Sequence, residues 1–368
     1  MPSNQNALGL MHRATLAEIA EKNRWIHSAP KGYTYLMRLK ALLFSPAELR
    51  GSVFPEFVLG EFSRCADFLG ESVEPSTWRE QRDRLAQVEV IVGTWGMPVL
   101  DAEFLAAAPN LRAVFYAAGS VKGFVTDASW DRGILVSSAW TANGIPVAEY
   151  TIGTILLSLK RFWHLTRAMR EPGSLGGNDL RVPGGYHSKV GLVSLGVIGR
   201  ATARLLRPFE IDVFAYDPFL PSDQAGEIGV TLISLEDLFR ECDVVSIHTP
   251  WIPSTERMIG RKLLSSMKEG ATLINTSRGA VVAEDELCEV LAERPDLSAV
   301  LDVTYPEPAA PDSPLRSLPN VMLTPHIAGS MQAEHARMAR WMADELVRFA
   351  AGEPLRYRVE RDMLAKMA

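Results

Sequence analysis

The segment VGLVSLGVIGR, residues 190–200, decides the fold class of this 368-residue chain. Its apolar start predicts a buried strand, and the glycines that follow predict a tight turn into a helix. Gly196 leaves room for a close backbone approach to a pyrophosphate, and Gly199 lets the helix pack tightly on the strand. The amides of Val197 and Ile198 begin the helix, where free N–H groups attract an anion. We therefore predict that this turn binds a dinucleotide.

Two residues near this turn bear on the ligand. Ser194 stands where the G-x-G-x-x-G pattern has its first glycine, and its Cβ would strain the turn if the position needs a positive φ. Asp217 lies 18 residues after Gly199, at the end of the next expected strand, where a carboxylate accepts both hydroxyls of an adenine ribose. Its charge would repel a 2′-phosphate, which favours NAD over NADP. The alternative is a glycine-tight turn without a ligand, and Ser194 is its best support.

Short apolar runs alternate with helix-like segments along most of the chain, which predicts parallel sheets with helices on both faces. The first set of expected strands is 39–43, 88–92, 111–116 and 134–137, with helices at 56–69, 76–86, 100–108 and 126–132. The second set of strands is 190–194, 212–216, 244–248, 272–275, 298–301 and 321–323, with helices at 198–208, 234–241 and 283–293. The six strands of the second set suit a doubly wound dinucleotide-binding sheet.

The remaining segments frame these two sets. Pro146 is expected to begin a long helix that runs to about Met169, because proline fits a first helical turn. Residues 171–187 are rich in Gly and Pro and should form a loop, and a final helix is expected at about 331–351. Residues 1–38 are interpreted as an N-terminal extension, either an ordered tail or an interaction arm.

Composition narrows the class of protein. Hydrophobic residues make up 47% and charged residues 22%, which is enough for a buried core. The net charge of −6 argues against a basic surface that binds nucleic acid. The cysteines Cys65, Cys242 and Cys288 are too few and too far apart for a disulfide scaffold or a zinc site. With neither a membrane-length apolar stretch nor a secretory signal, we expect a soluble cytoplasmic protein that binds no metal, membrane or nucleic acid.

Three polar residues each follow a strand of the second set, namely Arg278, Glu307 and His326. The carboxyl ends of strands in an open α/β sheet face the ligand crevice, so these side chains are expected to converge. A histidine exchanges a proton near neutral pH, a carboxylate fixes its tautomer, and a guanidinium pairs with a substrate carboxylate and polarises a carbonyl. Taken singly, each residue has a structural explanation. Together they suit hydride transfer between a dinucleotide and a 2-hydroxy acid.

The chain resembles the D-isomer-specific 2-hydroxyacid dehydrogenase family over about residues 39–350. The matching strings are VGLVSLGVIGR (190–200), LINTSRGAVVAEDEL (273–287), LDVTYPEP (301–308) and LPNVMLTPHIAGS (318–330). The last three strings are specific to the family, whereas the glycine turn alone is not.

The resemblance implies a role for each matching residue. Arg278, Glu307 and His326 fall on the family's catalytic arginine, glutamate and histidine. Asp302 falls on the acid that binds the nicotinamide amide, and Thr276 where a backbone carbonyl meets the same amide. The loop 248–250 resembles the one beside the adenosine half. The full cofactor-binding set is Gly196, Val197, Ile198, Gly199, Asp217, Thr249, Pro250, Thr276, Asp302, His326 and Gly329.

The resemblance also implies two doubly wound domains. A Rossmann cofactor domain, residues 147–328, would be inserted into a flavodoxin-like substrate domain formed by residues 39–146 and 329–368. The active site would lie in the cleft between them, and hinge closure would exclude water from hydride transfer. A homodimer through the cofactor domain and the helix after Pro146 is usual in the family.

Several positions depart from the family pattern or qualify it. Gly119 and Ser120 stand where the family often has Gly-x-Gly, whose amides hold the substrate carboxylate, and both can still donate. Trp95 replaces the arginine with which phosphoglycerate-type members bind a phosphate, so it predicts an apolar wall. Glu307 argues against formate oxidation, because formate dehydrogenases of this superfamily carry glutamine there. Trp95, Gly119, Ser120 and Arg278 are thus the expected substrate-binding residues.

The expected activity is NAD-linked interconversion of a 2-keto acid and a D-2-hydroxy acid. His326 would act as general acid and base, oriented by Glu307, while Arg278 anchors the substrate carboxylate. The alternative is an NAD(H)-sensing, corepressor-like binding protein without significant turnover, which would retain these residues for cofactor and fold. The acidic composition and the absence of a long disordered tail count against that alternative.

Overall fold

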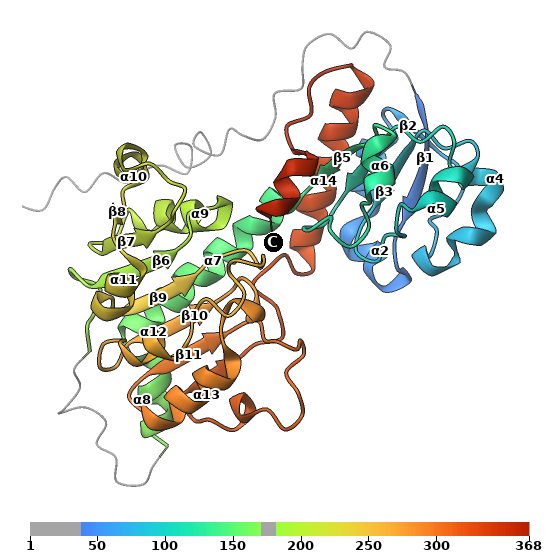
Figure 1. Ribbon diagram of the computed structural model, residues 1–368. Helices are drawn as coiled ribbons and strands as arrows, with labels where there is room; N and C mark the ends of the chain where they lie inside the picture. Colours follow the sequence, from blue (N-terminus) through green and yellow to red (C-terminus); the bar gives the residue numbers. More distant parts are fainter. Residues whose placement is uncertain (1–37, 171–181, 368) are drawn as a thin grey trace, which may run out of the picture. The chain divides into compact units, whose positions relative to one another are not determined.

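The computed structural model describes residues 38–170 and 182–367, whose strands form two sheets (Figure 1). The six-stranded sheet has the order β13-β5-β4-β3-β1-β2, and the seven-stranded sheet has the order β12-β11-β10-β9-β6-β7-β8. The seven-stranded sheet uses a continuous stretch of chain between β5 and β13. The predicted α/β class, with one doubly wound domain inserted into another, is therefore confirmed.

The six-stranded sheet is parallel except for its last strand. Its strands are β1 (Leu39–Phe44), β2 (Ala66–Phe68), β3 (Val90–Gly93), β4 (Ala113–Tyr116), β5 (Leu135–Ser138) and β13 (Arg358–Val359). β13 pairs antiparallel with β5, whereas every other pair is parallel. The central strands β3 and β4 are buried throughout, as expected for parallel strands that helices cover on both faces.

Within residues 38–170 and 182–367, eight helical segments accompany this sheet. They are α2 (Ala47–Val53), α3 (Glu56–Phe62), η1 (Pro75–Gln81), α4 (Arg82–Leu85), α5 (Ala102–Ala107), α6 (Asp127–Asp131), α14 (Ala333–Ala350) and η4 (Arg361–Ala365). The predicted helix 56–69 is wrong at its end, because β2 pairs there with β1 and this edge pairing wins over helix continuation. The predicted helix 76–86 is divided into η1 and α4, with non-helical dihedrals at Thr77.

The seven-stranded sheet is parallel throughout. Its strands are β6 (Lys189–Val193), β7 (Asp212–Tyr216), β8 (Thr231–Leu232), β9 (Val244–Ile247), β10 (Thr272–Asn275), β11 (Ser298–Leu301) and β12 (Val321–Leu323). The six predicted strands are present, and the two-residue β8 adds an edge that the sequence did not predict.

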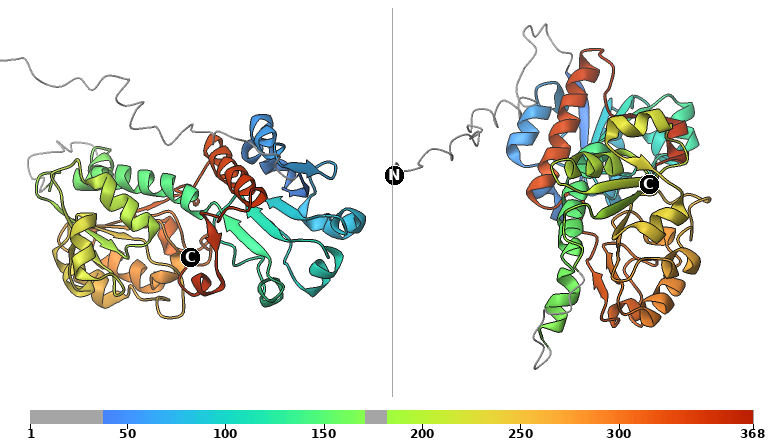
Figure 2. Two further views of the ribbon diagram at one scale, coloured as in Figure 1. Left: turned by 90° about the horizontal axis from the view of Figure 1, so that it is seen from above. Right: turned by 90° about the vertical axis from the view of Figure 1, so that its left-hand side faces the viewer.

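Helices cover both faces of this sheet (Figure 2). They are α7 (Trp140–Leu159), α9 (Val197–Leu206), α10 (Ser222–Ile228), α11 (Leu235–Glu241), α12 (Arg261–Ser265), η2 (Gly279–Val281), α13 (Glu284–Glu293) and η3 (Pro314–Arg316). Successive residues of β10 enter different cores: Leu273 packs in one apolar cluster and Ile274 in another. This alternation fixes the register of the sheet, because a slip of one residue would exchange the two faces.

The prediction that Pro146 begins a helix ending near Met169 is wrong. Helix α7 spans Trp140–Leu159 with Pro146 inside it, and a separate helix α8 spans Phe162–Ala168 after a left-handed Arg161. The start is set by the strand before it, because β5 turns directly into α7 and the amide of Asn143 already donates to the carbonyl of Ala139 at 2.9 Å. Pro146 therefore costs α7 one hydrogen bond rather than sitting free at its end.

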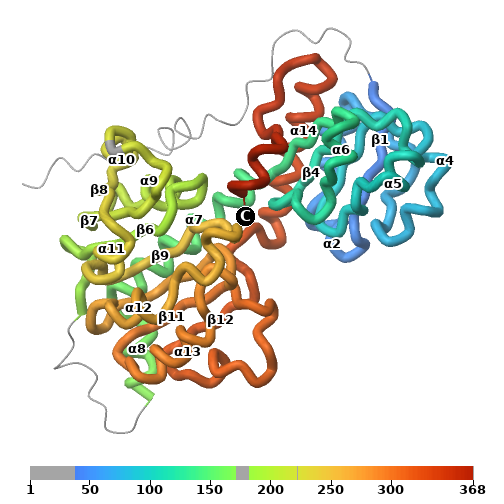
Figure 3. The backbone as a smooth tube through the Cα atoms, viewed as in Figure 1, coloured from blue at the N-terminus to red at the C-terminus, as the bar shows by residue number. Residues whose placement is uncertain are grey.

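A buried carboxylate fastens α14 to the six-stranded sheet. Glu345 is 1% exposed and accepts the hydroxyl of Ser137 on β5 at 2.8 Å. It also accepts the backbone amides of Arg356 and Tyr357 at 3.0 Å each. The chain thus enters the seven-stranded sheet after β5 and returns at α14 (Figure 3) to complete the sheet that it left.

Two expectations fall wholly or partly outside the described residues: the N-terminal extension, except for Arg38, and residues 171–181 of the predicted loop. Within the described parts of the chain, the helices are all too short or too polar to cross a bilayer.

Candidate active site

The turn after β6 leaves an open space at the start of α9. Gly196 is the N-cap of α9, and no side chain caps this helix end. A Cβ built on Gly196 meets nothing within 4 Å, whereas a Cβ on Gly199 would overlap the carbonyl of Ser194. The amides of Val197 and Ile198, in the first turn of the helix, are thus offered to an anion in front of Gly196. The residues present fit the pyrophosphate of a dinucleotide.

Ser194 adopts the conformation that the turn imposes. Its φ is +76°, in the left-handed region that favours glycine. Its hydroxyl lies 2.9 Å from the hydroxyl of Thr249, a buried residue of the loop after β9. Ser194 thus adopts a backbone conformation that is unfavourable for a residue with a Cβ, and its hydroxyl connects the loops after β6 and β9.

Asp217 is oriented by backbone amides. One carboxylate oxygen accepts the amide of Leu195 at 2.7 Å, and the other accepts the amide of Phe219 at 2.8 Å. Each oxygen keeps a further lone pair for an incoming hydroxyl. The carboxylate lies at the end of β7 beside the glycine turn, which is the arrangement that a ribose diol needs.

The loop 248–250 buries a histidine next to Thr249 and Pro250. His248 is 8% exposed, and burial lowers its pKa to about 4. Its Nε2 lies 3.1 Å from the hydroxyl of Ser246, while Nδ1 has no hydrogen-bond partner among the described residues. The imidazole is therefore neutral at physiological pH.

The turn after β10 is attached to α7 by a pair of hydroxyl groups. The hydroxyl of Thr276 lies 3.2 Å from the hydroxyl of Thr151 on α7.

His326 and Glu307 form the closest polar pair of the site. Nδ1 of His326 lies 2.5 Å from Oε1 of Glu307. His326 has a φ of +56°, and its amide donates to the carbonyl of Asp302 at 3.0 Å. Both side chains are partly exposed. Nε2 makes no hydrogen bond within the described residues, so it is the ring atom available to a ligand.

Asp302 holds the loop that carries His326. It is 2% exposed, and one oxygen accepts the hydroxyl of Thr324 at 2.6 Å and the amide of Ile327 at 2.8 Å. The other oxygen accepts the amide of Ala328 at 2.9 Å. The resemblance implied a contact with the nicotinamide amide; here the carboxylate is mostly engaged by its own loop, with one lone pair left on the second oxygen.

Arg278 is partly buried in the turn after β10. Burial lowers its pKa, and the charge of Glu307 acts in the opposite direction. Nη1 donates to the carbonyl of Ser277 at 2.7 Å. Asn275 shapes the turn, because its side chain donates to the carbonyl of Arg278 at 3.0 Å and accepts the amide of Ser277 at 3.0 Å. Asn275 was not a predicted site residue, although it lies in the string that carried the resemblance.

The expected substrate residues of the six-stranded sheet lie on its loops. Trp95 is half-buried and stands edge-on to His335 at 5.3 Å between ring centroids. The carbonyl of Gly119 accepts the hydroxyl of Ser138 at 2.6 Å, and Ser120 follows it, partly exposed. Within the described residues, no hydrogen bond, ion pair or ring contact joins Trp95 or Ser120 to the side chains of Arg278 and His326.

A further residue that the sequence did not single out is Asn143 of α7. Its amide group lies next to both Gly119 and Gly329, where a Cβ on either glycine would meet it at 3.3–3.6 Å. Its side-chain oxygen accepts the amide of Ser330 at 2.9 Å. Asn143 thus links the loop of Gly119 to the segment that follows His326. A signal for it was lacking, because an asparagine inside a helix has many structural uses.

Comparison with known proteins fits this geometry. Residues 152–328 match the family described as D-isomer specific 2-hydroxyacid dehydrogenase, NAD binding domain. A glyoxylate reductase from Korarchaeum cryptofilum is 34% identical over 300 residues, which cover 77% of this chain and 88% of that protein. A D-3-phosphoglycerate dehydrogenase from Archaeoglobus fulgidus is 32% identical over 294 residues, or 78% of this chain. The chain spans only 55% of that second relative.

Solved structures of related proteins have the same fold as this chain. A phosphoglycerate oxidoreductase from Rhizobium etli has a TM-score of 0.74 at 25% identity, covering 89% of this chain and all of that one. The NAD complex of a D-isomer specific 2-hydroxyacid dehydrogenase from Lactobacillus delbrueckii also has a TM-score of 0.74, at 22% identity, and covers 87% of this chain and all of that one. The latter supports the fold alone. Fold and sequence define a protein with two parallel α/β sheets that carries the NAD-binding domain of the 2-hydroxyacid dehydrogenases. The chain belongs to the D-isomer specific 2-hydroxyacid dehydrogenase family.

Proposed function

We propose that this protein interconverts a 2-keto acid and a D-2-hydroxy acid, with His326 as the general acid and base. The observation that carries the proposal is the 2.5 Å contact between Nδ1 of His326 and Glu307. A carboxylate on Nδ1 keeps the proton there, so Nε2 is the atom that exchanges a proton with the substrate. In reduction, Nε2–H gives its proton to the carbonyl oxygen, and Glu307 then stabilises the neutral tautomer that remains. NAD, when bound, supplies or accepts the hydride.

Arg278 is proposed to bind the substrate carboxylate. Its guanidinium stays charged in proteins, and partial burial removes water that would otherwise solvate it. Its single hydrogen bond within the described residues, to Ser277, leaves further N–H donors for an anion. A bidentate pair with a carboxylate would fix the substrate next to His326 and polarise its carbonyl.

The cofactor is proposed to lie along the ends of the strands of the seven-stranded sheet. The open space at Gly196 supports a pyrophosphate there, and the two amide bonds that orient Asp217 support a ribose diol. The proposal assigns the cofactor to residues 147–328, and the substrate side to residues 39–146 with 329–368. In this placement Thr249, Pro250, Thr276 and Asp302 would lie along the cofactor, together with Gly329, the first residue of the following segment.

The substrate is proposed to be an unphosphorylated 2-keto acid. Trp95, half-buried against the ring of His335, offers an apolar surface and no positive charge for a phosphate. Gly119 and Ser120 would contribute amides to the substrate carboxylate. The two relatives named above are a glyoxylate reductase and a phosphoglycerate dehydrogenase. The tryptophan favours the first of these substrate types.

The test is NADH oxidation with a panel of 2-keto acids: glyoxylate, pyruvate, hydroxypyruvate, phenylpyruvate and phosphohydroxypyruvate. We expect turnover of an unphosphorylated acid, and His326→Ala should lower kcat by about 10²–10⁴-fold with NADH binding retained. Normal turnover in that variant would remove His326 from the mechanism. An NADH-binding protein with no turnover on any of these acids would instead favour the corepressor-like role, and pull-down with and without NADH would then identify partners.

The proposal includes a homodimer. Leu157 on α7, Phe162 on α8 and Met169 directly after it are exposed apolar residues on consecutive segments of the chain. Covering such residues with a second copy would remove apolar surface from water. Light scattering on the purified protein should give twice the mass of the chain, and a monomeric mass would refute this part of the proposal.

A further inference from the structure

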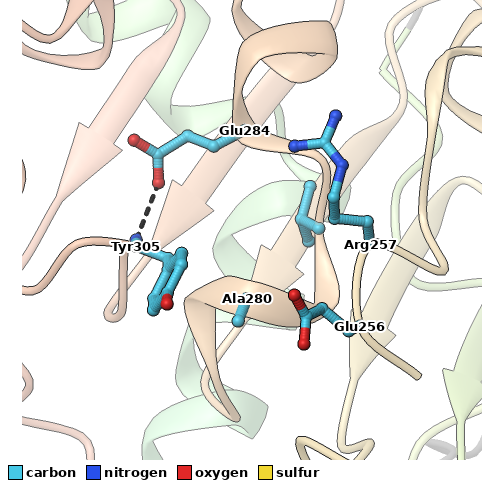
Figure 4. Close-up of a pocket in the computed structure, with 6 residues that line it drawn as sticks. Glu256, Arg257, Ala280, Glu284 and Tyr305 are labelled. Atoms are coloured by element: carbon cyan, nitrogen blue, oxygen red, sulfur yellow. Dashed lines mark hydrogen bonds between the residues drawn. The ribbon is translucent and has the colours of Figure 1, made fainter. Parts of the chain in front are cut away.

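The loop that carries Glu307 has a second attachment besides the contact with His326. The amide of Tyr305, two residues before Glu307, donates to Oε2 of Glu284 at 2.9 Å (Figure 4). The hydroxyl of Thr304 donates to the carbonyl of Pro306 at 2.8 Å. Glu284 is the first residue of α13, so the hydrogen bond ties the loop to a helix of the seven-stranded domain.

The turn that carries Arg278 rests on the same loop. A Cβ placed on Gly279 would overlap the backbone of Thr304, so the two backbones are in direct contact. The turn that carries Arg278 and the loop that leads to Glu307 therefore pack directly against each other. Glu284 follows the Arg278 turn in sequence, and its side chain accepts a hydrogen bond from the loop that carries Glu307. This one residue therefore connects the backbone segments of two predicted catalytic residues.

The carboxylate of Glu284 makes the hydrogen bond to Tyr305 and no ion pair with the neighbouring arginine. It lines a small pocket together with Glu256, Arg257, Ala280, Val282 and Tyr305 (Figure 4). The guanidinium of Arg257 pairs with Asp285 at 2.8 Å and not with Glu284. Burial raises the pKa of Glu284, and the amide of Tyr305 acts against that rise.

Helix stabilisation alone does not account for Glu284. An acid at the start of a helix interacts favourably with the helix dipole. Asp285 and Glu286 lie in the same first turn of α13 and supply that effect as well. What Glu284 adds is the long-range hydrogen bond to Tyr305, across 21 residues of sequence.

We propose that Glu284 is a positioning residue for the reaction: by holding the amide of Tyr305, it keeps the Glu307 carboxylate at Nδ1 of His326. This inference rests on the proposed function. It assigns Glu284 no contact with substrate or cofactor, so its effect should appear in kcat and in the pH dependence of kcat, and not in the KM for NADH.

The test compares Glu284→Ala, Glu284→Gln and Asp285→Ala. Loss of the acceptor in Glu284→Ala should lower kcat roughly 10-fold, since small misplacements of catalytic groups are costly. The KM for NADH should stay within about twofold, and the pH of half-maximal kcat should move. Glu284→Gln keeps an oxygen for the amide of Tyr305 and should restore most of kcat. Asp285→Ala removes the neighbouring charge at the same helix end and should leave kcat unchanged.

A second readout does not depend on turnover. Hydrogen–deuterium exchange of the free enzyme should be faster at the amide of Tyr305 in Glu284→Ala than in Glu284→Gln. Unchanged exchange, or a kcat and pH profile that match the wild type despite faster exchange, would overturn the proposal. Either result would leave the proposed function standing if His326→Ala is inactive, whereas absence of wild-type turnover would remove the proposed function itself.

Discussion

The buried imidazole of His248 should make the stability of the protein fall in mildly acidic solution. Its pKa is lowered from 6.5 to about 4 because the folded chain leaves no water to solvate a charged ring. In the unfolded chain the ring takes a proton near its ordinary pKa of 6.5. Between these two values the unfolded state binds more protons than the folded state, so stability is complete above about pH 6.5 and declines as the pH falls.

The size of this effect follows from the two pKa values. Their difference, 6.5 minus about 4, is about 2.5. One pH unit corresponds to about 1.4 kcal/mol, so His248 alone should remove about 3 kcal/mol of folding free energy between about pH 6.5 and pH 4. Other groups titrate in the same interval, and the measurement must therefore isolate this one.

His248→Gln isolates it, because the amide of glutamine can replace Nε2 as the partner of the Ser246 hydroxyl and does not titrate. Urea unfolding followed by circular dichroism, at several pH values, gives the difference in unfolding free energy between wild type and variant. That difference should shrink by about 3 kcal/mol as the pH falls. The side chain of His187 is 62% exposed, and His187→Gln is the matched control, which should leave most of the pH dependence in place. A constant difference between wild type and His248→Gln would refute the reasoning.

Two further predictions concern the cofactor and the fold. Asp217→Ala should weaken NADH binding and reduce the preference for NADH over NADPH, because the variant lacks the carboxylate that would repel a 2′-phosphate. Binding titrations with both cofactors measure this preference. An unchanged preference would contradict the assignment of Asp217 to the ribose. Glu345→Ala should lower the unfolding free energy by about 3–5 kcal/mol, because the buried hydroxyl of Ser137 and two partly buried backbone amides lose their acceptor. Glu345→Gln keeps one acceptor oxygen and should cost clearly less in the same urea titration; equal losses would show that the hydrogen bonds are not the cause.

The fold was predictable where burial alone decides the strands. Strands β10 and β11 have the predicted bounds, because a parallel strand covered on both faces is buried along its whole length and is marked by apolar residues. The edge strands β2, β8 and β13 have two or three residues each and exist through pairing with a neighbour. No local pattern marks them. The start of α7 was also missed, since it follows from the end of β5 and not from the position of Pro146.

The site was predictable as a set of residue types and not as a set of contacts. Arg278, Glu307 and His326 were predicted because each follows a strand of the same sheet, and their catalytic roles stay a proposal. Their supports, such as Glu284 and Asp302, act through hydrogen bonds to backbone amides about 20 or more residues away. Such contacts leave no pattern in a single sequence, because a backbone amide can donate to any acceptor that the fold brings to it.

The order of elements along the chain also bears on synthesis. The seven-stranded sheet is complete once residue 323 has left the ribosome. The six-stranded sheet begins earlier in the chain but lacks α14 with the carboxylate of Glu345 until residue 350 has been made, and it lacks β13 until residue 359 has been made. Domains generally fold as units during translation, so the inserted sheet can reach its final packing while the sheet around it still waits for its last strand. A nascent chain that stops between these two points would therefore hold one finished sheet and one with an open edge, the state in which unwanted strand pairing is most favoured.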